Sequence, residues 1–152
     1  MQPVNAKNFD ARHFSSASAQ ETRFIAAELA KELTPGDLLL LSGDLGAGKT
    51  QFVKGLSEGL GIDPDSVTSP TFTLQHCYYG NGVRLFHLDF YRLRDEDLPT
   101  VFDWVEMAEG ITAIEWADEW SARFTHRIFI DKGEGDSRII RIEEPGYEHP
   151  GS

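Results

Sequence analysis

Two segments of the chain repeat their hydrophobic positions with a helical period, and others show the apolar runs or the period of two that are typical of strands. The first helical segment begins after Ser18, which forms a capping-box pattern with Glu21 three residues later. Apolar residues then recur every four positions until Pro35-Gly36 ends the segment. They are Ile25, Leu29 and Leu33. The sequence therefore predicts a helix between Ser18 and Pro35.

A second amphipathic helix is predicted after Thr50 and ends at Gly61. One face of it carries Phe52, Val53, Leu56 and Leu60. Among the strand-like segments, residues 37–42 contain a continuous apolar run of four leucines, as expected of a strand buried on both faces. Two segments of period two flank Gly80-Asn81-Gly82 and predict a hairpin. The predicted strands span residues 37–42, 71–79, 83–91, 111–116, 127–131 and 138–143, and the last two are predicted to form a second hairpin around residues 132–136. Asp95 can cap a further helix to about residue 109.

The composition is that of one acidic globular domain. The chain has 152 residues, of which 40% are hydrophobic, and 14 Lys and Arg against 25 Asp and Glu give a net charge of −11. Such a chain lacks the positive surface of a protein that binds nucleic acid alone, and it suits an anionic membrane poorly. We expect a single domain over residues 1–152, with a core at about 9–144 and flexible ends at 1–8 and 145–152.

A cytoplasmic location is expected from three observations. Cys77 is the only cysteine, which excludes an internal disulfide framework and fits a reducing compartment. The longest purely apolar run, Leu38 to Leu41, is far shorter than the ~20 residues that cross a bilayer. The first residues lack the apolar segment of a secretory signal. We therefore expect no contact with membranes.

The strongest chemical signal is a phosphate-loop pattern, G-x-x-x-x-G-K-[ST]. Its residues are Gly43, Asp44, Leu45, Gly46, Ala47, Gly48, Lys49 and Thr50. The glycines let successive N–H groups converge on a phosphate, and the helix that follows adds the positive end of its dipole. Lys49 is expected to bridge the β- and γ-phosphates and Thr50 to bind Mg²⁺. Strand, loop and helix followed by further strands predict an α/β fold, a three-layer P-loop NTPase-like domain with a mixed central sheet.

The nucleotide expected in this loop is ATP or its product ADP. GTPases usually read guanine with [NT]-K-x-D, and no Asn or Thr in this chain is followed by Lys. A small-molecule kinase would close an arginine-rich lid over the phosphates. Between His87 and Glu119, however, ten acidic residues stand against only Arg92 and Arg94. The sequence therefore favours an ATP-binding protein over a GTPase or a kinase.

Two carboxylates are candidates for the chemistry. Glu115 ends the apolar run 111–115, as a Walker B carboxylate near Mg²⁺ does. A surface glutamate at the end of a strand would produce the same sequence pattern. Asp89 interrupts another apolar strand, where a carboxylate is costly unless it is paired or functional. The alternative for Asp89 is a structural ion pair with Arg92 or another arginine.

Four segments in this order resemble the TsaE (YjeE) family of bacterial P-loop ATPases, and the resemblance runs from about Ser18 to Ile142. They are the phosphate loop, Ser69-Pro70-Thr71-Phe72, His87-Leu88-Asp89-Phe90-Tyr91-Arg92 and Glu115-Trp116. Members of that family take part in making threonylcarbamoyladenosine at position 37 of tRNAs. They do not transfer the carbamoyl group themselves but dock onto the TsaD–TsaB heterodimer.

The resemblance also implies roles for individual residues. Lys49 would bind phosphate, and Thr50 and Glu115 would bind Mg²⁺. Thr71 would occupy a switch-like position near the γ-phosphate. Asp89 would act on the hydrolytic water, and Trp116 would contact the nucleotide with its aromatic ring. The family's loop usually reads Gly-Lys-Thr-Thr, whereas Gln51 follows Thr50 here. We count Gln51 among the nucleotide-binding residues, without the hydrogen bond that a second hydroxyl would supply.

We therefore expect an ATPase subunit that is weak alone and depends on a TsaD–TsaB-like heterodimer. In this hypothesis it supports threonylcarbamoyladenosine modification and contacts tRNA only indirectly, because its charge of −11 disfavours RNA. The alternative is a nucleotide-gated protein-binding module. In that case ATP orders the Ser69–Phe72 loop and stabilises a complex, and hydrolysis is incidental.

Overall fold

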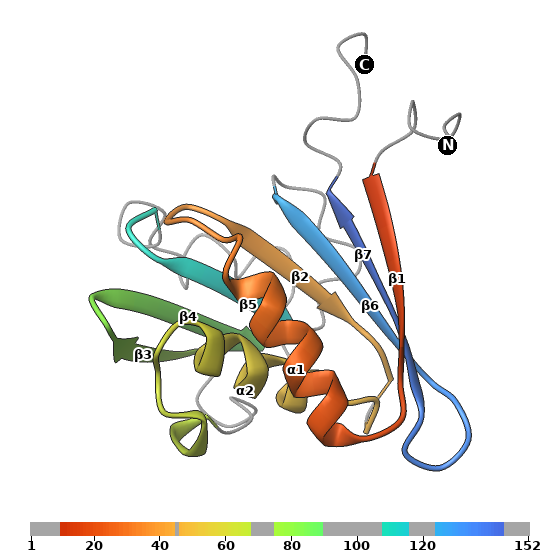
Figure 1. The fold of residues 1–152 in the computed structure, drawn as a ribbon. Coiled ribbons are helices and arrows are strands. Elements are labelled where there is room, and N and C mark those ends of the chain that lie inside the picture. Colours follow the sequence, from red (N-terminus) through yellow and green to blue (C-terminus); the bar gives the residue numbers. More distant parts are fainter. Residues whose placement is uncertain (1–9, 45, 68–74, 90–107, 116–123, 145–152) are drawn as a thin grey trace, which may run out of the picture.

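The computed structural model of the protein describes residues 10–44, 46–67, 75–89, 108–115 and 124–144. In this described part, seven strands form one sheet of order β1-β7-β6-β2-β5-β4-β3 (Figure 1). The strands are β1 (Asp10–Ser16), β2 (Leu38–Ser42), β3 (Gln75–Gly80), β4 (Val83–Asp89), β5 (Ile111–Glu115), β6 (His126–Lys132) and β7 (Arg138–Glu144). The helices are α1 (Ala19–Ala30) and α2 (Lys49–Gly59), and a short 3₁₀ helix, η2, spans Pro64–Ser66.

The centre of the sheet is parallel and its edges are antiparallel. β2 pairs in parallel with β5 and β6, and β5 pairs in parallel with β4. β3 is antiparallel to β4, and β7 is antiparallel to both β6 and β1. Residues Leu38–Leu41 of β2 are buried, as expected of a central strand. The predicted α/β class with a mixed central sheet is therefore confirmed.

Helices α1 and α2 lie side by side on one face of the sheet (Figure 1). The core between helices and sheet includes Leu39, Leu41, Phe52, Leu56, Ile128 and Ile130. Residues that alternate to the other face are also buried, as in a sheet covered on both sides; they are Leu38, Leu40, Phe86, Leu88 and Ile114. Of the three predicted layers, the described residues form the sheet and one helical layer. The helix predicted from Asp95 falls outside the described ranges, except for a turn at Ala108 and Glu109.

The start of α1 follows the capping-box prediction, except that the Glu21 side chain bonds to the residue before the N-cap. Ser18 Oγ accepts a hydrogen bond from the Glu21 N–H at 3.1 Å, and Glu21 Oε1 accepts one from the Ala17 N–H at 2.7 Å. The helix ends at Ala30, earlier than the pattern predicts. The chain beyond it continues in tighter turns, with the N–H of residue 32 bonded to the carbonyl of residue 29 at 2.9 Å. The apolar spacing therefore persists past the end of the helix itself.

The two helices approach each other closely because α2 presents Gly55 to α1. A Cβ at Gly55 would lie 2.2 Å from the Arg23 carbonyl oxygen and 2.7 Å from Ala26 Cβ. Gly59, one turn later, would meet the Ala27 carbonyl oxygen at 2.5 Å. Side chains at these two positions would push the helices apart.

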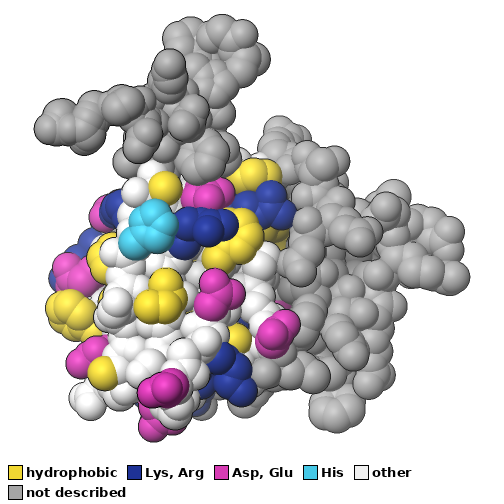
Figure 2. Space-filling model, turned by 90° about the vertical axis from the view of Figure 1, so that its right-hand side faces the viewer, with side chains coloured by type: hydrophobic (Ala, Val, Ile, Leu, Met, Phe, Trp, Pro, Cys, Tyr) yellow, Lys and Arg dark blue, Asp and Glu magenta, His cyan; other side chains and the backbone are white. Residues whose placement is uncertain are grey.

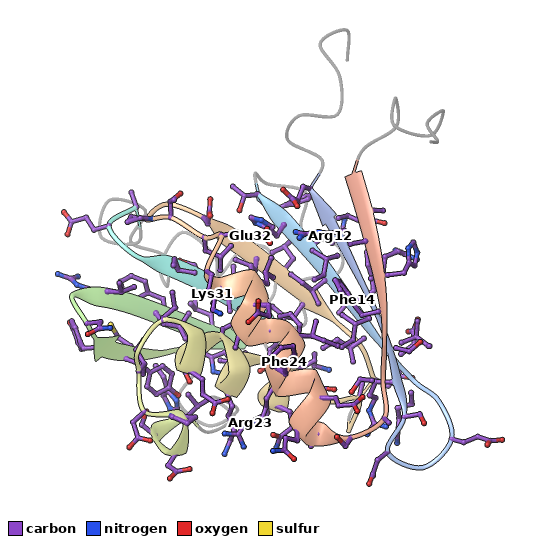
Figure 3. The ribbon with its side chains drawn as sticks, viewed as in Figure 1. Arg12, Phe14, Arg23, Phe24, Lys31 and Glu32 are labelled. Atoms are coloured by element: carbon purple, nitrogen blue, oxygen red, sulfur yellow. The ribbon has the colours of Figure 1, made fainter. Side chains whose placement is uncertain are left out.

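Edge strand β1 is absent from the sequence prediction. It pairs with β7 along its whole length, and Phe14 is its one large apolar residue. Arg12 holds it in place, with Nη1 3.0 Å from Glu32 Oε2 and Nη2 2.7 Å from Glu144 Oε2 (Figure 3). These carboxylates raise the pKa of Arg12, so the guanidinium stays charged. Because its partners lie on other elements, no local pattern indicates this strand.

Both predicted hairpins are present. β3 and β4 are joined by Asn81 and Gly82, whose φ values of 49° and 77° suit a two-residue turn. β6 and β7 are joined by residues 133–137. Residues 71–74 and 90–91 of the predicted strands lie outside the described ranges. Neither helix of the described chain is long and apolar enough to cross a membrane.

Candidate nucleotide-binding site

The glycine-rich loop joins the carboxyl end of β2 to the start of α2. Gly46 and Gly48 have φ values of 79° and 112°, in the left-handed region that favours glycine. Gly48 is the N-cap of α2, and no side chain caps its amides. The first N–H groups of α2 have no acceptor within the helix and point out of its N-terminal end, towards a position where an anion can bind.

Lys49 is buried at the base of this loop, with 6% of its surface exposed. Its Nζ donates to the carbonyl oxygen of Gly43 and, at 3.2 Å, to that of Asp44. The Ala47 N–H donates to the same Asp44 oxygen at 2.9 Å and closes the loop into a turn. A buried ammonium needs such partners, and they hold it inside the loop.

A cleft of about 300 Å³ opens beside the loop. It is lined by Gly46, Gly48, Lys49, Thr50, Gln51, Glu115 and Arg138. Glu115 reaches it because β5 lies next to β2, with Glu115 opposite Leu41 in register. Gly43 and Asp44 instead line a neighbouring hollow of about 390 Å³, and Ala47 is buried. The fold thus brings six of the predicted site residues to one cleft.

Glu115 has a partner within the protein. Its Oε2 lies 2.5 Å from Nε2 of His87 on β4, and both side chains are buried. His87 is thus held by a buried hydrogen bond to Glu115. Among the described residues, His87 Nδ1 is buried without a hydrogen-bond partner. Burial, and to a lesser extent the nearby His87, lowers the pKa of His76 on β3.

The remaining predicted residues are placed only in part. Asp89 ends β4 and is paired in register with Glu115, so their backbones lie side by side at the carboxyl ends of parallel strands. The side chain of Asp89 is not among those the structure describes. Leu45, Thr71 and Trp116 lie outside the described residues. Their assignments, like that of Asp89, stay predictions.

Arg138 is the one lining residue of the cleft that the sequence analysis missed. It begins β7, and its guanidinium donates to the carbonyl oxygens of Ala47 at 2.7 Å and Gly46 at 3.2 Å. An arginine at the start of a predicted strand carries no signal that would have identified it. Only the packing of the β6–β7 hairpin against the loop brings it to the site.

The oxygen atoms of the cleft fit a magnesium ion. Thr50 contributes a hydroxyl and Glu115 a carboxylate, and Mg²⁺ prefers such hard ligands. Within the described ranges, no three His, Cys, Asp or Glu side chains gather as a metal site. Mg²⁺ in phosphate sites needs no such cluster, because substrate phosphates and water supply its other ligands.

The sheet, the loop and the cleft define a P-loop NTPase-like α/β domain. The model of the family described as threonylcarbamoyl adenosine biosynthesis protein TsaE matches residues 16–140. The chain belongs to the TsaE family.

Individual relatives agree with this assignment. The chain is 39% identical to the tRNA threonylcarbamoyladenosine biosynthesis protein TsaE of Bacillus subtilis, over 88% of this chain and 86% of that one. It is 41% identical to the Streptomyces coelicolor protein of the same name, over 76% of this chain and 82% of that one. The crystal structure of Bacillus subtilis YdiB matches with a TM-score of 0.70 and 32% identity, over 91% of this chain and 88% of that one.

Proposed function

We propose that the protein binds and hydrolyses ATP with Mg²⁺ and supports the synthesis of threonylcarbamoyladenosine in tRNA. The observation that carries the proposal is the shared cleft of Lys49, Thr50 and Glu115 at the start of α2. A cation, a helix N-terminus and two oxygen ligands in one place are what a polyphosphate with its metal requires.

Each residue has a distinct part in this proposal. The Lys49 ammonium moves from the carbonyls of its own loop to the β- and γ-phosphate oxygens, a stronger charge-assisted contact. The uncapped N–H groups of α2 bind the β-phosphate. Thr50 and Glu115 would hold Mg²⁺, which when bound neutralises phosphate charge. Asp89 orients or activates the hydrolytic water, Thr71 responds to the γ-phosphate, and Trp116 lies beside the nucleotide.

The process is proposed from the names of the relatives, which are tRNA threonylcarbamoyladenosine biosynthesis proteins. The protein would act in the cytoplasm on a TsaD–TsaB-like heterodimer. Contact with tRNA through that heterodimer is supported by the net charge of −11. On the side of the molecule drawn in Figure 2, acidic side chains are interspersed among the basic ones. Neither feature favours RNA binding by this chain alone.

Nucleotide binding is tested by calorimetry with ATP and ADP in the presence of Mg²⁺. We expect the wild-type protein to bind both and Lys49→Ala to lose roughly hundredfold or more in affinity, because a buried charge-assisted contact disappears. Lys54→Ala, on the same helix but away from the cleft, is the matched control and should bind normally. Equal ATP affinity of Lys49→Ala and wild type would contradict the proposal. Displacement of labelled ATP by GTP should be weaker than by ATP.

Hydrolysis is tested by multiple-turnover assays with and without the heterodimer. We expect slow turnover by the protein alone and a clear stimulation by the partner. Pull-down of the heterodimer in ATP, ADP and no nucleotide shows whether complex formation follows the nucleotide. Nucleotide-dependent docking without stimulated turnover would favour the gated binding module over the ATPase.

A further inference from the structure

Arg138 binds the phosphate loop and the neighbouring turn with four hydrogen bonds. Its Nε donates to the Ala47 carbonyl oxygen at 2.7 Å, and its Nη2 to that of Gly46 at 3.2 Å. Nη1 donates to the carbonyl oxygens of Gly135 at 3.0 Å and Ser137 at 2.7 Å. The guanidinium thus ties two adjacent peptides of the loop to the turn between β6 and β7.

The carbonyl contacts fix the direction of the loop's N–H groups. In a trans peptide the C=O and the following N–H point in opposite directions. When Arg138 holds the carbonyls of Gly46 and Ala47, the N–H groups of Ala47 and Gly48 therefore point away from the guanidinium. The Ala47 N–H closes the turn onto Asp44 at 2.9 Å. The Gly48 N–H precedes Lys49 at the start of α2, the region proposed to bind phosphate.

The hairpin that carries Arg138 packs tightly against the start of the loop and is in van der Waals range of its end. A Cβ at Gly43 would lie 2.6 Å from the carbonyl oxygen of Ile130 on β6. A Cβ at Gly48 would lie 3.7 Å from Nε of Arg138. The loop is rich in glycine and costly to order, so contacts that hold it before a ligand arrives reduce the cost of binding.

Resting on the proposed function, we infer that Arg138 is a positioning residue that pre-organises the phosphate loop for the polyphosphate. Four of its five N–H groups donate to protein carbonyls, so its main action is on the conformation of the loop. Among the described residues, no carboxylate forms an ion pair with it, and it lines the cleft together with Lys49. Lys cannot replace it, because one nitrogen cannot span the carbonyls that the planar guanidinium reaches.

The test compares Arg138→Lys and Arg138→Gln with Lys132→Gln. Lys132 belongs to the same hairpin and is exposed. Its Nζ would lie 3.6 Å from a Cβ at Gly46, so the Lys132→Gln variant also removes one positive charge near the loop. Calorimetry with Mg·ATP and Mg·ADP should show a loss of roughly tenfold to hundredfold for both Arg138 variants. The loss should be less than roughly threefold for Lys132→Gln, because a single exposed charge contributes little.

A second readout follows the loop without any nucleotide. Hydrogen exchange of the protein alone should become faster at the amides of residues 46–50 in both Arg138 variants, with β2 and β5 unchanged. A merely structural role of Arg138 would instead raise exchange throughout the sheet, and that result would overturn the inference. Wild-type affinity in Arg138→Lys, or equal losses in Arg138→Gln and Lys132→Gln, would also overturn it.

The two proposals fail in different ways. If the proposed function is wrong, wild-type protein and Lys49→Ala bind ATP equally or not at all. If only the role of Arg138 is wrong, Lys49→Ala loses ATP while the Arg138 variants retain it and their loop amides stay protected.

Discussion

Nε2 of His87 lies 2.5 Å from Oε2 of Glu115, and both side chains are buried. The two residues come from neighbouring parallel strands, β4 and β5, with Ala113 as the register partner of His87. The hydrogen bond holds one oxygen of the Glu115 carboxylate at the carboxyl end of the sheet, beside the phosphate loop. His87 therefore sets the orientation of the carboxylate proposed to serve Mg²⁺.

His87→Ala should destabilise the fold by about 1–3 kcal/mol beyond the loss of packing, because it leaves a buried carboxylate oxygen without its partner. Chemical denaturation of both single variants and the double variant with Glu115→Gln measures the coupling, which should exceed about 0.5 kcal/mol. His76→Ala is the matched control, since His76 is the register partner of His87 on β3 but bonds to Tyr78. Additive effects of His87→Ala and Glu115→Gln would show that the bond contributes nothing.

Asp89 and Glu115 should differ in what their substitution removes. Glu115→Gln keeps an oxygen near His87 but weakens the metal ligand, so the Mg²⁺ dependence of ATP binding and the turnover should both fall. Asp89→Asn should leave ATP bound and reduce partner-stimulated hydrolysis roughly hundredfold or more, because water activation matters only towards the transition state. Calorimetry at several Mg²⁺ concentrations and steady-state turnover separate the two. Normal hydrolysis by Asp89→Asn with reduced stability would make Asp89 a structural residue.

Gly55→Ala should destabilise the protein although alanine is the better helix former. Helix propensity alone predicts a gain of about 0.8–1.0 kcal/mol. The added Cβ, however, would lie 2.2 Å from the Arg23 carbonyl oxygen, and overpacking of this kind costs about 1–3 kcal/mol or more. Urea denaturation measures the balance, with half-buried Lys54→Ala on the same helix as the control. A stabilised Gly55→Ala would mean that α1 and α2 separate without cost.

The stability of the protein should fall as the pH drops below 6.5, because of His126. Burial lowers the pKa of His126 from its ordinary value of 6.5, and this outweighs the opposing effect of Glu144, whose Oε1 lies 3.9 Å from Nε2. Asp37 and Glu32 also act to raise the pKa, and Arg12 to lower it. The unfolded chain therefore takes up the proton first. The contribution of neutral His126 to the stability is complete above pH 6.5, and it is lost as the pH falls towards the lowered pKa of His126 in the folded protein.

Denaturation between about pH 8 and about pH 5 measures this effect. His126→Gln should flatten the acid side of the stability profile. His13→Gln, an exposed histidine on β1, should leave the profile unchanged. His76 shifts in the same direction as His126, so some slope will remain in His126→Gln. Identical profiles of wild type and His126→Gln would contradict the assignment.

Much of the candidate site could be predicted because its signals are local. Gly43 to Thr50 lie in one loop, and the four leucines before them predict the buried strand that ends there. Glu115 could be predicted from the apolar run that it ends. The residues next to Glu115 in the folded protein could not be predicted, because the order of the strands decides which side chains meet at the carboxyl edge of the sheet. Only the pairing of β5 between β2 and β4 brings Glu115 to Lys49 on one side and His87 on the other.

The amino-acid sequence by itself determined the elements, since hydrophobic period, capping residues and glycine placement act within a few residues of one another. It determined the phosphate loop, both helices, both hairpins and the central strands. The tertiary structure alone decided β1, whose Arg12 meets Glu144 132 residues away, and Arg138, whose loop contact at Ala47 is 91 residues away. The physical reason is that these groups are stabilised only when the whole sheet has assembled. No periodic pattern along the chain records a contact between elements so far apart.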